Sequence, residues 1–204
     1  FRSLFRNTKA AFHRNELNKL SYSWEIFLWV AALAFHYSFF VVITRHLRFF
    51  LEPVPACLKF LEFMDGIVQL GLPNIMLSGV VLLAAALFLL ARRIFDSKVS
   101  YISLAADYFP LFLIIGIAVT GIFMRYFTKL DIVGVKQFTM GLVTFSPVLP
   151  EGVGGLFYAH LFMVCVLIAY FPMSKLMHMG GIFLSPTRNM ANNTRAKRDR
   201  KSTR

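Results

Sequence analysis

The residues best suited to redox or metal chemistry are four histidines in apolar surroundings. His36 and His46 stand ten residues apart, and His160 and His178 stand eighteen apart near the end of the chain. The stretch from 160 to 178, HLFMVCVLIAYFPMSKLMH, is long enough to cross a membrane, which takes about 20 apolar residues. An imidazole inside lipid is costly unless it is bonded, so each ring requires a partner.

Two helices that run in opposite directions would bring these histidines into two pairs. At 3.6 residues per turn, eighteen residues make about five turns, so His160 and His178 share one helix face. His36 and His46 lie only about 15 Å apart along their helix axis, whereas His160 and His178 lie about 27 Å apart. Helix tilt, side-chain reach and a kink at Pro172 absorb that difference. The antiparallel arrangement pairs His36 with His178 near the inner face, and His46 with His160 near the outer face.

Two imidazoles that face each other are the axial ligands of a bis-histidine haem iron. The four histidines therefore predict two b haems at two depths, and with them a path for electrons across the membrane. Zinc fits less well, because each pair offers only two nitrogens. The plainer alternative is that each ring is a hydrogen-bonded helix-packing residue. His13 has a polar surrounding, and we expect no ligand role for it.

The composition indicates an all-α membrane protein. The chain has 204 residues, of which 57% are hydrophobic and only 16% are charged, whereas soluble domains carry about 25% charged residues. Four apolar segments are long enough to span a bilayer as helices: 24–44, 70–91, 104–127 and 154–176. We expect a transmembrane helix bundle in which residues 23–180 form the dihaem domain, between a basic segment, 1–22, and a basic tail, 181–204. Because the chain starts at Phe1, a leading span is expected to be absent from it.

The net charge of +12 is concentrated beside the apolar segments rather than on one surface. This pattern follows the positive-inside rule and argues against nucleic acid as a partner. Segment 1–22, the turn at Arg92 and Arg93, and the tail are predicted to be cytoplasmic. Segments 45–69 and 128–153 balance basic with acidic residues, and we expect them to be outer loops. The protein is thus predicted to cross the cytoplasmic membrane four times, with both ends inside.

Basic residues close to the span ends are candidates for charge-assisted hydrogen bonds to the haem propionates. They are Arg45 and Arg48 near the outer haem, and Lys175, Arg92 and Arg93 near the inner haem. Contact with lipid headgroups explains these residues equally well. Anchoring at the membrane interface is the expected role of Asp107 and Arg125, which bracket the third span.

A quinone requires an apolar slot with a few polar groups on its oxygens. Near the outer histidine pair, the candidates are Lys59, Asp65 and Lys136, together with Arg45. A carboxylate such as Asp65 or Glu62 would accept the proton of a quinol, and a solvated loop residue is the alternative reading of each acid. The sequence does not decide the direction of the reaction, so both quinol oxidation and quinone reduction agree with it.

The histidine spacing, with the sequence YFPMSKLMHMGG at 170–181, resembles the gamma subunit of respiratory nitrate reductase. That family is a membrane dihaem cytochrome b in which quinol is oxidised near the outer haem. The resemblance implies the histidine pairing given above and a menaquinol substrate. The nitrate branch has five spans, against four visible here. Its quinol site uses a lysine after the second histidine of the early helix, and Lys59 lies in that direction but closer to His46.

The tail sequence MGGIFLSPTRNMANNTRAKR at 179–198 resembles, more narrowly, DsrM, the cytochrome b of the membrane complex associated with dissimilatory sulfite reduction. The resemblance covers the chain from about Ser21. It implies a cytoplasmic iron–sulfur partner of heterodisulfide-reductase-like character, and further membrane and periplasmic cytochrome or iron–sulfur subunits. The basic tail would suit docking on the cytoplasmic partner, and a solvated tail or a contact with lipid is the alternative.

The sequence thus predicts an electron-transfer subunit that connects menaquinol to a cytoplasmic iron–sulfur protein, linked to sulfate or sulfite reduction. A cofactor-free transporter or assembly scaffold is the alternative. That alternative predicts charges along the spans and inverted repeats, whereas the interiors of the four apolar segments carry almost no charge.

Overall fold

The computed structural model describes residues 16–66, 74–128, 130–149 and 152–177. Three predicted features lie outside these ranges, namely His13, His178 and the basic tail. The chain divides into two compact units, residues 1–163 and residues 164–204. The histidines His46 and His160 both belong to the first unit, so their surroundings can be described together.

The ordered elements of the described ranges are helices. They are α2 (Glu16–His46), α3 (Ala56–Asp65), α4 (Leu77–Phe95), α5 (Ser97–Ile102), α6 (Ala105–Phe123), α7 (Ile132–Val143) and α8 (Gly155–Tyr170). Four helical stretches are long and apolar enough to cross a membrane, namely Ser23–Phe49, Leu77–Phe95, Ala105–Thr128 and Gly155–Met173. The predicted all-α transmembrane architecture with four spans is confirmed.

Some predicted boundaries and loops were wrong. The second span begins at Leu77 rather than at 70, because Met76 is still extended and Asp65 caps the first turn of α4 through the backbone N–H of Ser78. The segments expected to be plain loops contain α3 and α7, which are too short to span a membrane. Their apolar residues are interrupted by charges, so hydropathy alone did not reveal them.

The last span also differs from the expectation of one unbroken helix. α8 ends at Tyr170, and 3-10 turns follow at Phe171–Met173 and Lys175–Met177, separated by the extended residue Ser174. Pro172 explains the change, because proline cannot donate the hydrogen bond that would continue the helix. This break agrees with the kink expected at Pro172, and because His178 lies outside the described residues, its place relative to His160 stays a prediction.

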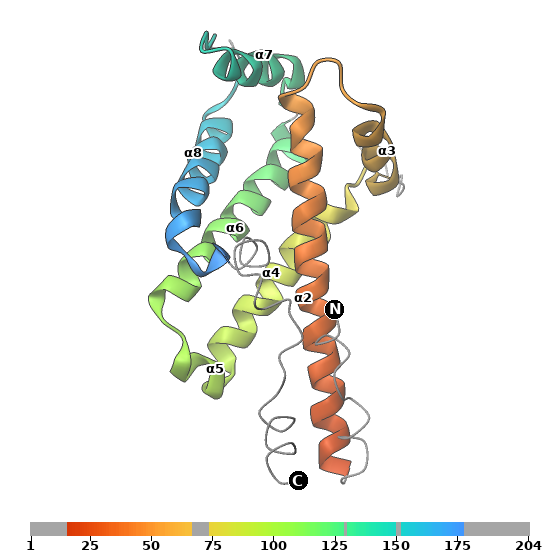
Figure 1. The fold of residues 1–204 in the computed structure, drawn as a ribbon, viewed down its shortest axis with the longest axis vertical. Coiled ribbons are helices and arrows are strands. Elements are labelled where there is room, and N and C mark those ends of the chain that lie inside the picture. Colours follow the sequence, from red (N-terminus) through yellow and green to blue (C-terminus); the bar gives the residue numbers. More distant parts are fainter. Residues whose placement is uncertain (1–15, 67–73, 129, 150–151, 178–204) are drawn as a thin grey trace, which may run out of the picture. The chain divides into compact units, whose positions relative to one another are not determined.

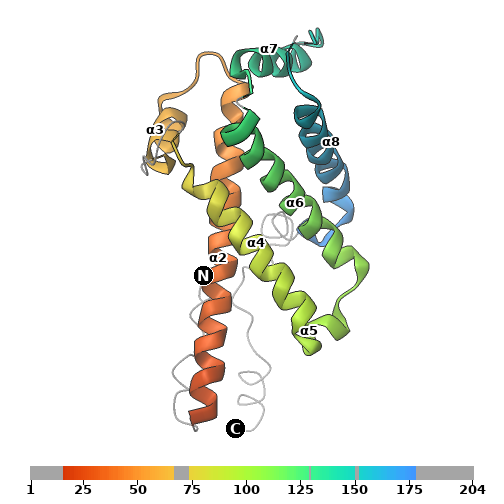
Figure 2. The same cartoon turned by 180° about the vertical axis from the view of Figure 1, so that it is seen from behind.

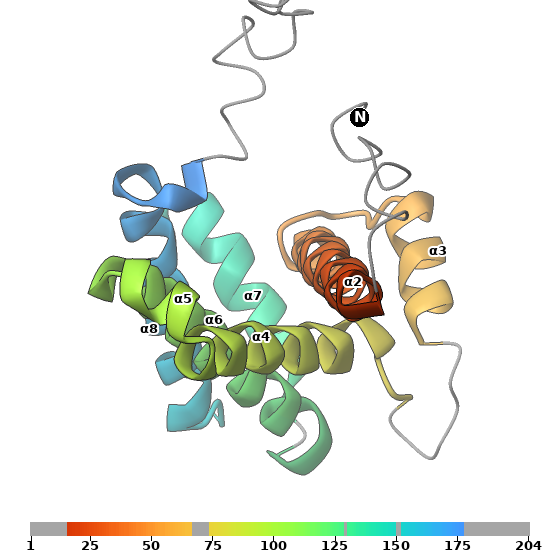
Figure 3. The ribbon, with the colours of Figure 1, turned by 90° about the horizontal axis from the view of Figure 1, so that it is seen from below.

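In the first unit, α2 packs against α4, and α4 packs against α6 (Figure 1). The short helix α3 also contacts α2, and Figure 2 shows both from behind. In Figure 3, α2 is seen nearly end-on with α4 passing beside it. The end of this unit where α7 lies is called the α7 end, and the opposite end, where α5 lies, is called the α5 end.

The main apolar cluster of the first unit lies at the α7 end. Met124, Val135, Phe138 and Phe157 pack together there, and Phe49 lies against them. The cluster joins α6, α7, α8 and the end of the first span. α7 crosses the ends of the longer helices in both Figure 1 and Figure 2. It therefore closes the bundle at this end with apolar side chains, which keep water away from what lies beneath.

Two further contacts fix α7 in this position. Its N-terminus is capped by Asp131, whose carboxylate accepts hydrogen bonds from the backbone N–H groups of Val133 and Gly134 at 3.0 and 3.2 Å. The hydroxyl of Thr139 lies 2.7 Å from the carbonyl oxygen of Phe49 and donates to it. α7 is thus tied to the end of the first span as well as packed on it.

The turn after α7 provides a test of this packing. A Cβ atom on Gly141 would lie 2.7 Å from the carbonyl oxygen of Ser146 and 3.1 Å from Cα of Pro147. Both are backbone atoms that cannot move aside easily, so Gly141→Ala is expected to destabilise the fold by about 1–3 kcal/mol, the usual cost of overpacking. The measurement is the thermal unfolding midpoint of the purified protein in detergent.

The matched control is Gly79→Ala in α4, where an added Cβ meets no atom within 4 Å. Alanine favours a helix over glycine by about 0.5–1 kcal/mol, so this variant should be as stable as the parent or more so. Equal midpoints for the two variants would contradict the proposed tight turn.

Candidate functional site

His46 and His160 both lie toward the α7 end, and their predicted role as an axial pair stays a prediction. His46 is the last residue of α2, and His160 lies in the first half of α8. The two imidazoles are near enough for a charge on one ring to act on the other. The ring of His46 also lies 6.0 Å, between centroids, from the ring of Phe49. The apolar cluster under α7 therefore adjoins this histidine pair.

The two histidines of α2 are held in the same way. Nδ1 of His46 donates to the carbonyl oxygen of Val42 at 2.7 Å, and Nδ1 of His36 donates to that of Ala32 at 2.7 Å. Each acceptor lies one helical turn before its histidine. A proton on Nδ1 leaves Nε2 unprotonated, with its lone pair available to a metal.

His160 obtains the same arrangement from another helix, α6. Its Nδ1 lies 2.8 Å from Oγ1 of Thr120. That hydroxyl donates to the carbonyl oxygen of Gly116 at 2.8 Å, so its lone pair accepts the imidazole N–H. The backbone of Ile117 is a further acceptor for this ring. His160 therefore also keeps Nε2 free for a ligand bond.

The close approach of α6 to His160 depends on Gly121. A Cβ atom at this position would lie 3.3 Å from Cε1 of the His160 ring, closer than an ordinary van der Waals contact. Glycine lets the helix backbone pass next to the imidazole, so the ring keeps the orientation that Thr120 sets. Neither Thr120 nor Gly121 was identified from the sequence, because nothing local distinguishes them from other small residues in a span.

These three histidines fit the axial ligation of haem iron. Each has Nδ1 hydrogen-bonded to the protein, as the non-ligating nitrogen of a metal-bound imidazole usually is. Within the described ranges, no three or more His, Cys, Asp or Glu side chains are grouped to hold a metal ion. The donor set is therefore one of histidine pairs rather than a cluster of the zinc type. The predicted pairing of His36 with His178 stays a prediction, because His178 lies outside the described residues.

A buried polar network, which we call the polar junction, ties together four segments at the α7 end. Its centre is an ion pair between Arg45 of α2 and Asp65 of α3, whose side chains are only 14% and 7% exposed. Ser78 of α4 donates to the same carboxylate twice, from its backbone N–H at 2.7 Å and from its hydroxyl at 2.6 Å. Arg45 also donates to the Ser78 hydroxyl at 3.1 Å. Both carboxylate oxygens of Asp65 therefore accept hydrogen bonds from within the protein.

The fourth segment of the polar junction is a π-helical turn, Met124–Thr128, at the end of α6. The hydroxyl of Tyr126 accepts a hydrogen bond from the backbone N–H of Met76 at 2.8 Å and lies 3.4 Å from the carbonyl oxygen of Asn74. A guanidinium nitrogen of Arg125 lies 3.4 Å from that same carbonyl oxygen. Arg45 thus contacts the first turn of α4 at Ser78, and Arg125 contacts the residues just before it at Asn74.

A pocket of about 230 Å³, which we call the α7-end pocket, opens beside this network. Its lining comes from the end of the first span, the following loop, α3 and α7: Arg48, Phe49, Val54, Lys59, Glu62, Ile132 and Lys136. Arg48 forms an ion pair with Glu62, and Lys136 forms one with Glu52. Lys59 has no ion pair within the described part of the chain, so its ammonium group is available to a ligand.

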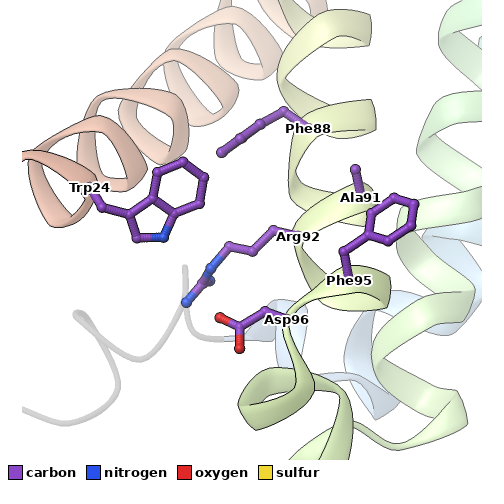
Figure 4. Close-up of a pocket in the computed structure, with 6 residues that line it drawn as sticks. All are labelled: Trp24, Phe88, Ala91, Arg92, Phe95 and Asp96. Atoms are coloured by element: carbon purple, nitrogen blue, oxygen red, sulfur yellow. The ribbon is translucent and has the colours of Figure 1, made fainter. Parts of the chain in front are cut away.

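A second pocket, of about 390 Å³, lies at the α5 end between the start of the first span and the end of α4 (Figure 4). Trp24 and Phe88 form its aromatic side, and Arg92 extends between them and Asp96. The Nε atom of Arg92 is buried and has no hydrogen-bond partner among the described residues. Its neighbour Arg93 differs, because it lies 3.7 Å from a carboxylate oxygen of Asp107.

Comparison with known proteins places the chain in a family. The family model described as nitrate reductase gamma subunit matches residues 18–198. The chain belongs to the nitrate reductase gamma subunit family.

Two relatives carry the name Hdr-like menaquinol oxidoreductase cytochrome b-like subunit. The one from Archaeoglobus profundus is 44% identical over 202 residues, and the one from Archaeoglobus fulgidus is 41% identical over the same length. Each alignment covers 97% of this chain and 59% of the relative, so the chain spans about three fifths of the length of these relatives.

In this member of the nitrate reductase gamma family, the predicted site residues fall into separate groups. Lys59 and Lys136 share the α7-end pocket, whereas Arg45 and Asp65 bind each other in the polar junction. Arg48 contacts Glu62 at the pocket wall. Lys175 lies in the second compact unit. The predicted contacts of Arg45, Arg48 and Lys175 with haem propionates, and of Asp65 with quinone, stay predictions, but Arg45 and Asp65 already satisfy each other.

The polar junction yields a stability prediction for this family member. Asp65→Ala leaves the Arg45 charge buried without a counter-ion, and breaking such a pair costs about 3–5 kcal/mol. Glu52→Ala removes the partner of Lys136 from a pair in which the glutamate side chain is 63% exposed, and exposed pairs contribute about 0–1 kcal/mol. Thermal unfolding in detergent should show a large loss for the first variant and little change for the second.

Proposed function

We propose that the chain is the membrane cytochrome b subunit of a respiratory complex, in which menaquinol is oxidised at the α7 end and electrons pass through two bis-histidine haems. The observation that carries this proposal is the state of the histidines. His36, His46 and His160 lie on apolar spans, and Nδ1 of each ring is hydrogen-bonded within the protein. A polar ring on a membrane span needs a partner, and an iron with two open axial positions is one that takes two such nitrogens.

The α7-end pocket is the proposed menaquinol site. It adjoins the histidine pair through Phe49, which lines the pocket and lies 6.0 Å from the His46 ring between centroids. Lys59 is positioned to donate a hydrogen bond to a quinol oxygen. The apolar side chains of Phe49, Val54 and Ile132 suit the ring and tail of the quinol.

Oxidation of menaquinol to menaquinone releases two electrons and two protons. Glu62 is the proposed first acceptor of a proton, because it lines the pocket and its side chain is 31% exposed, so a proton on it can pass on to water. Asp65 is less suited, since its carboxylate is enclosed by Arg45 and Ser78. Haem bound between His46 and His160 would supply the one-electron acceptor. In this proposal Lys59 orients the quinol, Glu62 accepts its two protons one after the other and passes each to water, and the two electrons leave singly to the haem that His46 and His160 would hold. α7 excludes water from the histidine pair.

The proposed orientation places the α7 end outside and the α5 end inside the cytoplasmic membrane. The basic turn at Arg92 and Arg93 then follows the positive-inside rule. Electrons would leave at the α5 end toward a cytoplasmic iron–sulfur partner, which the names of the two Archaeoglobus relatives support through the term Hdr-like. A link to sulfite or sulfate reduction, and further membrane and periplasmic subunits, stay predictions from the tail motif at 179–198.

The ligand assignment is tested by absorption spectroscopy with haem quantitation. The reduced protein should show b-type bands from two haems. His46→Ala and His160→Ala should each remove one haem and the same one, because both ligands belong to one pair. His36→Ala should remove the other.

His13→Ala serves as the control and should retain both haems. If the parent protein, purified from cells that make haem proteins, has no b-type absorption, the proposal is wrong and a transporter or scaffold role remains. Loss of haem in His13→Ala would show that the ligands are misassigned.

The quinol site is tested by Lys59→Gln. Loss of a charge-assisted hydrogen bond to the substrate should lower kcat/KM for menaquinol analogues by about tenfold, equivalent to about 1.4 kcal/mol. Reduction of the haems by dithionite should be unaffected. Phe63→Ala, one turn along the same helix, changes a side chain that is 64% exposed and does not line the pocket. A similar fall in both variants would remove Lys59 from the site.

A further inference from the structure

The polar junction contains more positive than negative charge. Arg45 and Arg125 both reach the segment just before and at the start of α4, at Ser78 and Asn74 respectively. Asp65 is the carboxylate of this network, and it is bound by Arg45. Among the described residues, Arg45 therefore has a counter-ion and Arg125 has none. Charges that are partly buried in a protein are expected to be paired.

The described residues around Arg125 supply no negative charge that pairs with it. Its Nε atom is buried and lacks a hydrogen-bond partner in the described structure, and no carboxylate of the described residues forms an ion pair with it. Its guanidinium carbon lies 5.9 Å from the ring centroid of Tyr126, and one terminal nitrogen contacts a backbone carbonyl. A ring face and a peptide oxygen stabilise a cation only partly. The group therefore retains the capacity to bind an anion.

The position of Arg125 relates it to the histidine pair at the α7 end. It follows Gly121 by four residues, about one helical turn, and a Cβ atom on Gly121 would lie 3.3 Å from Cε1 of the His160 ring. Thr120, which holds that ring, lies in the same stretch of α6. On the other side of the polar junction, Arg45 directly precedes His46. The junction thus borders the site from both of the helices that hold its ligands in place.

We infer that Arg125 provides the positive charge for a propionate of the haem held by His46 and His160, an inference that rests on the proposed function. A guanidinium group matches a carboxylate through two parallel hydrogen bonds. This assignment differs from the expectation drawn from the sequence, which gave that role to Arg45 and Arg48. Both of those residues have a carboxylate partner in the protein, Asp65 and Glu62 respectively. A lipid phosphate offers the same anionic chemistry, and the test separates the two.

The experiment is a redox titration of the b-type absorption bands in membranes that contain the full-length chain with its partner subunits. A nearby positive charge stabilises the reduced haem, which carries one electron more. Arg125→Gln is therefore expected to lower the midpoint potential of the haem that is lost in His46→Ala, and to leave the potential of the other haem unchanged. Arg125→Lys keeps the charge and should restore most of the parent potential.

Tyr126→Phe is the matched control. It removes the hydroxyl that ties the end of α6 to Met76 without changing any charge, so a purely structural role would give it the same effect as Arg125→Gln. Equal shifts in these two variants would overturn the inference. If Arg125→Gln also prevents assembly, the charge-retaining Arg125→Lys decides: restored haem content with a near-parental potential supports the inference, and continued loss of the protein contradicts it.

Two further outcomes are informative. Unchanged potentials in Arg125→Gln, with both haems present, overturn the inference while leaving the proposed function in place. If that variant instead loses co-purifying phospholipid and keeps its potentials, the anion is a lipid headgroup and the inference is wrong. Absence of haem from the parent protein would refute the proposed function itself, so the two failures are distinguishable.

Discussion

The ion pair between Arg45 and Asp65 is the interaction on which the rest of the α7 end depends. Buried charges tolerate little displacement, because a poorly aligned pair does not recover the cost of leaving water. Ser78 completes the shell of the carboxylate from α4, so three helices are held at one point. Tyr126 and Arg125 bring the end of α6 to the same place. Since His46 follows Arg45 directly, the polar junction also sets where that imidazole stands.

The histidines illustrate two ways of fixing the orientation and tautomer of an imidazole ring. In α2 the acceptor for Nδ1 is a carbonyl of the preceding turn, so the helix itself fixes the tautomer of His36 and His46. His160 instead relies on Thr120 of a different helix, and on the missing side chain of Gly121 for clearance. Its readiness for a ligand therefore depends on the packing of α6 beside α8. A shift between these helices would free the ring, whereas the rings of α2 would keep their hydrogen bonds.

The charged groups at the α7 end divide into those that hold the structure and those that remain for ligands. Arg45, Arg48 and Lys136 each meet a carboxylate, in order of increasing exposure of the acid from Asp65 to Glu62 to Glu52. Lys59 and Arg125 have no such partner in the described structure. Lys59 lines a pocket with both charged and apolar walls, and Arg125 lies about one helical turn after Gly121, which passes close to the His160 ring. The site at Lys59 would therefore suit a neutral quinol, and the site at Arg125 would suit an anionic group.

The sequence by itself determined the four spans, the all-α class and the family, and it identified His36, His46 and His160 as chemically unusual. These features follow from hydropathy and spacing, which are properties of contiguous residues and are unaffected by what packs against them. Tertiary structure alone decided which cation meets which acid, that Thr120 and Gly121 serve His160, and that short helices form in the segments expected to be loops. Arg45 and Arg125 look alike in the sequence, since each is a basic residue near a span end. Only the approach of Asp65, which lies twenty residues after Arg45 in the chain, gives Arg45 a counter-ion. Arg125 has none among the described residues.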